Sequence, residues 1–125
     1  MKKIKTLDDL KAIREKNRAA VEPAEGATII RVGVATCGVA AGSRAVMAAI
    51  EDELAKNKVG HTTVVGVGCL GFCYAEPLVE VESAGFEPIR YGYVDEARAR
   101  EIVRQHILRG ELLDNAIIER EVRRA

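Results

Sequence analysis

The chain has 125 residues, enough for one domain with a single hydrophobic core but too few for separate cofactor and substrate domains. Lys plus Arg and Asp plus Glu each number 19, so the net charge is zero and the overall field does not favour nucleic acid or an anionic membrane as a partner. The apolar stretch 32–41 is far shorter than the roughly 18 residues of a membrane-spanning helix, so we expect no membrane span. Asp8 and Asp9 stand where a signal peptide would have its apolar run, and we therefore expect a cytoplasmic protein.

The first 27 residues predict a helical arm and a linker. Thr6 with Asp9 three residues later is a helix-capping pattern, and apolar residues follow at helical spacing as far as Ile13, so the helix should run to about Asn17. Basic side chains in this arm are interspersed with acidic ones, which favours a solvated helix face over a nucleic-acid site. Residues 19–27 contain proline, glycine and small residues, a composition that is typical of a linker.

Residues 28–112 predict a small domain, and residues 113–125 a C-terminal tail. The β-branched run 28–35 is almost continuously apolar, as expected of a strand that is covered on both faces. Ser43 can cap a helix that Gly60 should end. The remaining predicted elements are strands at 62–65, 78–82 and 89–93, the last two forming an antiparallel hairpin, and a helix that Asp95 caps and Gly110 ends.

This order of elements predicts the fold class. A strand, a helix and a strand, followed by a hairpin and a last helix, give a small mixed sheet of about four strands flanked by two helices. With the helical arm in front, the chain has the outline of an α/β thioredoxin-like fold.

The three cysteines are placed as a metal cluster would require. Cys37 follows the first strand in a glycine-containing turn, and Cys69 and Cys73 lie in a second loop that should be at the same end of the sheet. Backbone N–H groups in such turns favour negative charge, so they would stabilise thiolates or an anionic cluster. An odd number of cysteines in a reducing compartment argues against a disulfide framework. Iron–sulfur or thiol chemistry is therefore the first hypothesis.

Three other interpretations of the cysteines stay open. A tetrahedral zinc site would need a fourth ligand from His61, His106 or a carboxylate, and C-x3-C is less usual than C-x2-C for structural zinc. A thioredoxin-type dithiol would need C-x-x-C at the first strand-to-helix turn, where Cys37 stands alone. The cysteines could also be inert and buried, although such residues do not require neighbouring glycines.

Two further features predict no chemistry. Residues 66–71 formally match G-x-G-x-x-G, but a strand pattern rather than a helix follows, so we expect no dinucleotide site there. We expect His61 to be a solvated turn residue and His106 to lie on or beside the apolar face of the last helix, so both are predicted to be structural.

Three segments carry a resemblance to a known family: ATCGVAAGS at 35–43, GCLGFCYAEPLVEV at 68–81 and RYGYV at 90–94. Together they resemble the thioredoxin-like 2Fe-2S ferredoxin family, and most closely the HndB-type small subunits of NAD(P)-reducing, electron-bifurcating hydrogenases. The similarity runs from about Thr28 to Leu112, and the basic arm before it also resembles the HndB type.

The resemblance implies a 2Fe-2S cluster with Cys37, Cys69 and Cys73 as ligands. Four-cysteine members of the family have C-x4-C followed by C-x3-C, and the second position of that pattern is Gly42 in this chain. The fourth ligand would then be a neighbouring group, with Ser43 as the candidate, a residue from elsewhere, or water.

The resemblance also implies a function and partners. We expect an electron-transfer subunit with no catalytic residue of its own, associated with flavin- and iron–sulfur-containing subunits of a cytoplasmic NAD(P)-linked oxidoreductase, in the first place an NAD(P)-reducing hydrogenase. The competing hypothesis is a cluster-free thioredoxin-like adaptor that holds the larger subunits of such a complex together.

Overall fold

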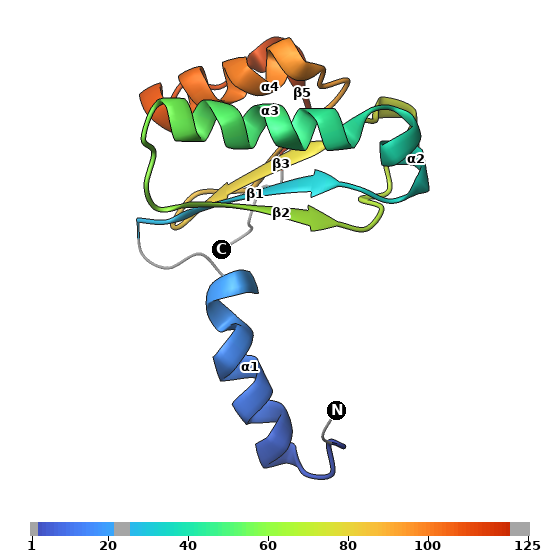
Figure 1. Ribbon diagram of the computed structural model, residues 1–125, viewed down its shortest axis with the longest axis vertical. Coiled ribbons are helices and arrows are strands. Elements are labelled where there is room, and N and C mark those ends of the chain that lie inside the picture. Colours follow the sequence, from blue (N-terminus) through green and yellow to red (C-terminus); the bar gives the residue numbers. More distant parts are fainter. Residues whose placement is uncertain (1–2, 22–25, 121–125) are drawn as a thin grey trace.

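The computed structural model describes residues 3–21 and 26–120, which form an α/β domain and an N-terminal helix that stands apart from it (Figure 1). The helices are α1 (Leu7–Val21), α2 (Thr36–Ala40), α3 (Ser43–Lys56) and α4 (Glu96–Ile102), and α4 continues into the π-helical turn η2 (Val103–Ile107). The strands are β1 (Thr28–Gly33), β2 (Thr62–Val67), β3 (Val79–Ser83), β4 (Ile89–Tyr91) and β5 (Ile117–Arg120). Two short 3-10 turns, η1 (Cys73–Ala75) and η3 (Asp114–Ala116), precede β3 and β5.

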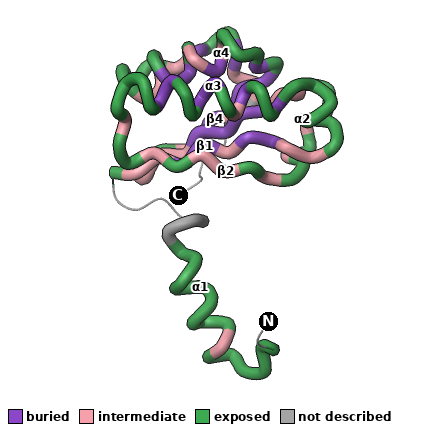
Figure 2. Tube along the Cα trace, in the orientation of Figure 1, coloured by how far each residue is buried: buried purple, intermediate pink, exposed green. Residues whose placement is uncertain are grey.

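The five strands form one mixed sheet in the order β2-β1-β3-β4-β5. β1 and β2 are parallel, and the other neighbouring pairs are antiparallel. α3 and α4 lie together over one face of the sheet, and the buried residues are concentrated between these helices and the strands (Figures 1 and 2). Because side chains alternate along a strand, every second residue of β1, β3 and β4 faces the helices. The fully buried residues there include Ile30, Val32, Val79, Tyr91, Ile50 and Ile102.

The sheet face opposite the helices carries a network of ion pairs. Arg31 of β1 pairs with Glu82 at 2.6 Å and with Glu80 at 3.0 Å, both on β3, and Arg90 of β4 pairs with Glu80 at 2.7 Å. Arg31 lies directly opposite Glu80, and Glu80 directly opposite Arg90, so the pairs join three neighbouring strands. The sequence predicted that β1 is covered on both faces. Helices cover one face, and on the other Ile29 is buried beside the charged side chains of this network rather than under a second layer of helices.

The helix boundaries differ from the prediction at two glycines. Ser43 is the first residue of α3 rather than its N-cap, a position that Gly42 takes with a left-handed φ of +97°. α3 ends at Lys56 rather than at Gly60, because Asn57 donates from its side-chain nitrogen (2.8 Å) and its backbone nitrogen (3.2 Å) to the carbonyl oxygen of Glu53. The turn between β1 and α3, predicted as a loop, contains the short helix α2.

The sheet also extends beyond residue 112. β5 lies in the segment that was predicted to be a tail, and it pairs with β4, with Ile117 opposite Tyr91. The sheet therefore has five strands instead of about four. Residues 121–125 of that segment lie outside the described residues.

α1 begins as predicted. The Thr6 hydroxyl accepts from the backbone N–H of Asp9 (3.2 Å), and the Asp9 carboxylate accepts from the N–H of Thr6 (3.2 Å). The helix continues past Asn17 to Val21, and its apolar residues Leu7, Leu10 and Ile13 are exposed (Figure 2). Residues 22–25 of the predicted linker lie outside the described residues. Within the described ranges, no helix is long and apolar enough to cross a membrane.

Candidate iron–sulfur site

The two cysteine loops meet at one end of the sheet. Cys37 lies in α2, shortly after β1, and Cys69 and Cys73 follow β2. Since β1 and β2 are parallel neighbours, both loops leave the same edge of the sheet (Figure 1). All three cysteines are free and exposed, so the interpretation as buried, inert residues is wrong.

Glycines let α2 lie close against the end of β1. A Cβ added to Gly38 would overlap the carbonyl oxygen of Gly33 and lie 3.2 Å from Oε2 of Glu76, and one added to Gly33 would lie 3.3 Å from Oε1 of the same carboxylate. Oε2 of Glu76 also accepts from the backbone N–H of Leu78 at 2.9 Å. Only glycine permits such an approach, so Gly38 fixes the position of its neighbour Cys37. Neither this role of Gly38 nor the inward-turned Glu76 was predicted from the sequence.

The three thiols interact with one another. Sγ of Cys69 lies 3.4 Å from Sγ of Cys73, and the N–H of Gly71 donates to Sγ of Cys69 at 3.3 Å. Hydrogen bonding with Cys69 and then with Cys37, together with their charge, raises the pKa of Cys73 to about 12. The thiols therefore resist becoming thiolates together, and a cationic centre that binds them must displace their protons.

The spacing of two of the thiols suits a shared metal. Two thiolates about 2.3 Å from one tetrahedral metal lie about 3.8 Å apart, close to the Cys69–Cys73 separation. Among the described residues, no group of three or more His, Cys, Asp or Glu is placed to hold a metal ion. Thiolates are also the usual ligands of 2Fe-2S clusters, in which the ligands are divided between two irons.

Two unusual residues lie where the fourth ligand is expected. Gly42 has a left-handed backbone, and an added Cβ would meet no atom within 4 Å. The next residue, Ser43, is completely buried, and its hydroxyl has no hydrogen-bond partner among the described residues. A buried hydroxyl is normally satisfied, so an unpaired Ser43 Oγ is unusual. Its burial distinguishes it from the three exposed thiols.

Of the other predicted features, the G-x-G-x-x-G match at 66–71 contains Cys69, whereas His61 precedes β2 at the other end of that strand. The G-x-G-x-x-G match leads into the 3-10 turn η1 and not into an α-helix. His61 is exposed, with its carbonyl oxygen accepting from the N–H of Thr28 (2.8 Å).

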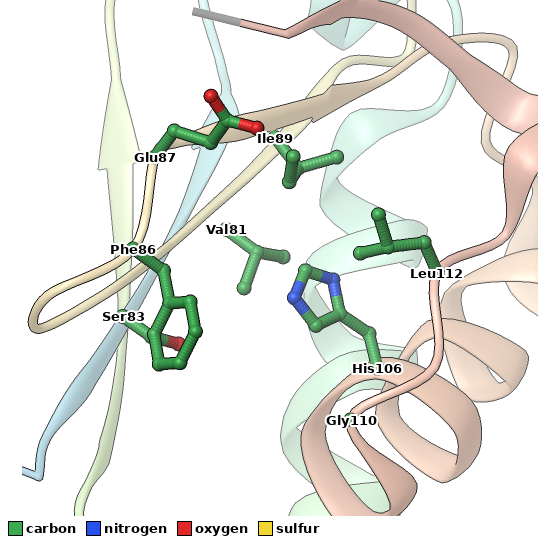
Figure 3. A pocket seen from close by; sticks show the side chains of 8 residues that line it. All are labelled: Val81, Ser83, Phe86, Glu87, Ile89, His106, Gly110 and Leu112. Carbon is green, nitrogen blue, oxygen red and sulfur yellow. The ribbon is translucent and has the colours of Figure 1, made fainter. Parts of the chain in front are cut away.

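A cavity of about 270 Å³ lies at the opposite end of the sheet (Figure 3). Its walls include Val81, Phe86 and Leu112, and the His106 imidazole lies among them. Nδ1 of His106 is 2.8 Å from the hydroxyl of Tyr91, and burial lowers the pKa of His106, which keeps the ring neutral. His106 thus joins η2 to β4, the structural role that the sequence predicted.

Comparisons with known proteins agree with this fold and site. No protein-family model matches the chain. A thioredoxin-like [2Fe-2S] ferredoxin from Aquifex aeolicus superposes with a TM-score of 0.68 at 25% identity, covering 79% of this chain and 96% of that one. The wild-type crystal structure of the Aquifex aeolicus ferredoxin at 1.5 Å resolution gives a TM-score of 0.66 at 25% identity, covering 77% and 99%. The predicted fold class is confirmed: the architecture is that of the thioredoxin-like 2Fe-2S ferredoxins.

A curated relative defines the family more narrowly. The chain is 40% identical over 117 residues to the NADP-reducing hydrogenase subunit HndB of Solidesulfovibrio fructosivorans, and the match covers 94% of this chain and 93% of that protein. The chain therefore belongs to the HndB family, as its sequence motifs indicated.

Proposed function

We propose that the chain is the electron-transfer subunit of a cytoplasmic, multi-subunit NAD(P)-linked oxidoreductase, and specifically of an NADP-reducing hydrogenase. One observation carries the proposal: Cys37, Cys69 and Cys73 come together in exposed loops at one edge of a ferredoxin-like sheet. The relationship to HndB supports the choice of complex, and the likeness to 2Fe-2S ferredoxins supports the cofactor.

In this proposal the cysteines are ligands and not catalytic groups. Cys69 and Cys73 would hold one iron and Cys37 the other, with Ser43 as the candidate for the remaining position. A bound 2Fe-2S cluster supplies one-electron transfer. The chain contributes thiolates, the Gly71 N–H that donates to Cys69 Sγ, and the fixed position of α2.

The proposed partners are the flavin- and iron–sulfur-containing subunits of the same complex. The domain that contains strands β1 to β5 would carry the cluster. The arm at residues 1–27, whose helix α1 exposes an apolar stripe, would contact a partner as an amphipathic helix in a groove.

The cofactor is tested by analysis of anaerobically purified protein. We expect iron and acid-labile sulfide at about two each per chain and a 2Fe-2S signal by electron paramagnetic resonance after reduction. Stoichiometric zinc without sulfide would refute the cluster. A protein that contains neither, yet assembles with the larger subunits, would instead be the cluster-free adaptor.

The ligands are tested one at a time. Cys37→Ala, Cys69→Ala and Cys73→Ala should each abolish or strongly destabilise the cluster, because each leaves one iron without a thiolate, while Val39→Ala in the same loop should retain it. Ser43→Ala should shift the visible spectrum if Ser43 is the fourth ligand. An unchanged spectrum would exclude Ser43 as the fourth ligand and leave a residue from a partner, or water, in that role.

A further inference from the structure

Two of the three thiols lie almost within bonding distance of each other. Sγ of Cys69 is 3.4 Å from Sγ of Cys73, whereas the two sulfurs of a disulfide are about 2.05 Å apart, so they need to approach by roughly 1.4 Å. Both residues are exposed, so a small oxidant or reductant reaches either sulfur from solvent. The pair therefore has the separation and the access that thiol–disulfide exchange requires.

The segment between these two cysteines can adjust, whereas the third cysteine is held in place. Gly71 has a φ of +90°, and a Cβ added to it would meet no atom within 4 Å, so the loop is not packed at this point. Cys37 is the second sulfur neighbour of Cys73, after Cys69. It lies in α2, where Gly38 is packed against the end of β1. Of the three sulfurs, that of Cys37 is thus the least able to move into a bond.

We propose that Cys69 and Cys73 form a reversible disulfide in the metal-free chain, and that this bond closes the site to metal until a thiol reductant opens it. The oxidant is a low-molecular-weight disulfide, R–S–S–R. One cysteine thiolate attacks it, forming a mixed disulfide and releasing R–S⁻, and the second thiolate then displaces the other R–S⁻. The two thiol protons end on two molecules of R–SH, so two cysteine sulfurs are oxidised and one R–S–S–R is reduced.

The bond changes what the site can bind. Metal ligands must be thiolates, and the sulfurs of a disulfide carry no negative charge, so one oxidation step removes two of the three donors. Exposed thiols are otherwise open to irreversible oxidation to sulfinic acid, whereas a disulfide is recovered by reduction. The inference rests on the proposed function only in taking Cys69 and Cys73 as ligands, because formation of the bond itself requires no cluster.

The bond is tested on the full, metal-free chain incubated with oxidised glutathione. Alkylation and mass spectrometry should show one free thiol per chain, at Cys37, and a peptide map should join Cys69 to Cys73. Cys37→Ser is the matched control and should form the bond at a rate within about twofold of the wild type, whereas Cys69→Ser should form an intramolecular bond at least about tenfold more slowly and retain bound glutathione. A bond between Cys37 and Cys73 as the main wild-type product, or glutathione retained on all three thiols, would overturn the proposal.

Closure of the site is tested with cadmium(II) alone, because the sulfide used to build a cluster would itself reduce a disulfide. The reduced chain should give the ultraviolet absorption of cadmium–thiolate bonds, and the oxidised chain should bind cadmium at least about tenfold more weakly until dithiothreitol is added. Equal affinity of the two forms, with the disulfide mapped in one of them, would refute the inference. A reduced chain that binds cadmium but never assembles iron and sulfide would instead refute the proposed function and leave the disulfide in place.

Discussion

Gly38→Ala is expected to destabilise the domain and displace Cys37. The added methyl group would overlap the carbonyl oxygen of Gly33 and lie 3.0 Å from its carbonyl carbon, and both atoms belong to the backbone of β1, which cannot rotate away. Forcing a methyl group into a packed site costs about 1 to 3 kcal/mol, and occasionally more. Alanine in a helix is favoured over glycine by about 1 kcal/mol, which offsets part of that cost. A contact this short places the cost near the upper end of the 1 to 3 kcal/mol range, so we expect a net loss of about 2 kcal/mol in the free energy of unfolding.

The loss is measured by thermal and urea unfolding of the metal-free protein. A net 2 kcal/mol corresponds to a Tm about 7 °C lower for a domain of this size. Gly68→Ala in the other cysteine loop is the control, because its added Cβ would meet no atom within 4 Å. It should leave Tm within about 2 °C of wild type. After reconstitution, Gly38→Ala should also contain less iron than the control. Wild-type stability together with full iron content would refute the role of Gly38 in positioning Cys37.

Three further outcomes follow from the described contacts. Hydrogen bonding from Arg104 lowers the pKa of Glu53 from 4.5 to about 2, so its carboxylate stabilises the fold above pH 4.5 and this contribution is lost as the pH falls toward 2. Glu53→Gln should therefore flatten that part of the acid-unfolding curve, and parallel curves for the variant and the wild type would contradict the prediction. Gly42→Ala should lower the Tm of the metal-free protein by several degrees, because a left-handed backbone costs about 1 to 3 kcal/mol for a residue with a side chain. An unchanged Tm would show that the loop relaxes. Deletion of residues 1–20 should leave the Tm of the domain within about 2 °C of the wild-type value, because α1 stands apart from the domain. The same deletion should reduce co-purification with the flavin-bearing subunit. A truncated domain that unfolds would contradict the prediction.

The elements that the sequence predicted are those with a local signal. The helix α3 and the hairpin of β3 and β4 follow from apolar spacing, and Asp95 caps α4 as expected, with its carboxylate accepting from the N–H of Arg98 at 2.7 Å. β5 has no such signal, because only Ile117 and Ile118 are apolar among its four residues. What makes it a strand is the free edge of β4, a partner that is distant in the sequence.

The candidate site also has one part that a sequence pattern predicts and another part that it does not. That Cys37, Cys69 and Cys73 share one edge follows from a strand, helix and strand unit with parallel strands, which a pattern can reveal. The packing of Gly38 against Gly33 and Glu76 could not be predicted, because it depends on how α2 turns back onto β1. Gly42 did offer a signal: glycine directly before a helix can take the left-handed conformation that displaces the serine from the N-cap position.

The distribution of charge bears on how the proposed electron carrier would be tuned. The ion pairs that hold the domain together lie on the open sheet face and between α3 and α4, where Arg100 contacts Asp52 at 2.6 Å and Glu53 at 3.0 Å. None of them involves a residue of the cysteine loops. The potential of a cluster depends on nearby charge, on hydrogen bonds to sulfur and on exposure to water. The hydrogen bond from the Gly71 N–H to Sγ of Cys69 is one such control, and Arg90, which lies 5.9 Å from the centre of the Phe72 ring, brings a charge close to the second cysteine loop. Because all three thiols are exposed, a partner subunit that covered them would exclude water and shift the potential of the cluster.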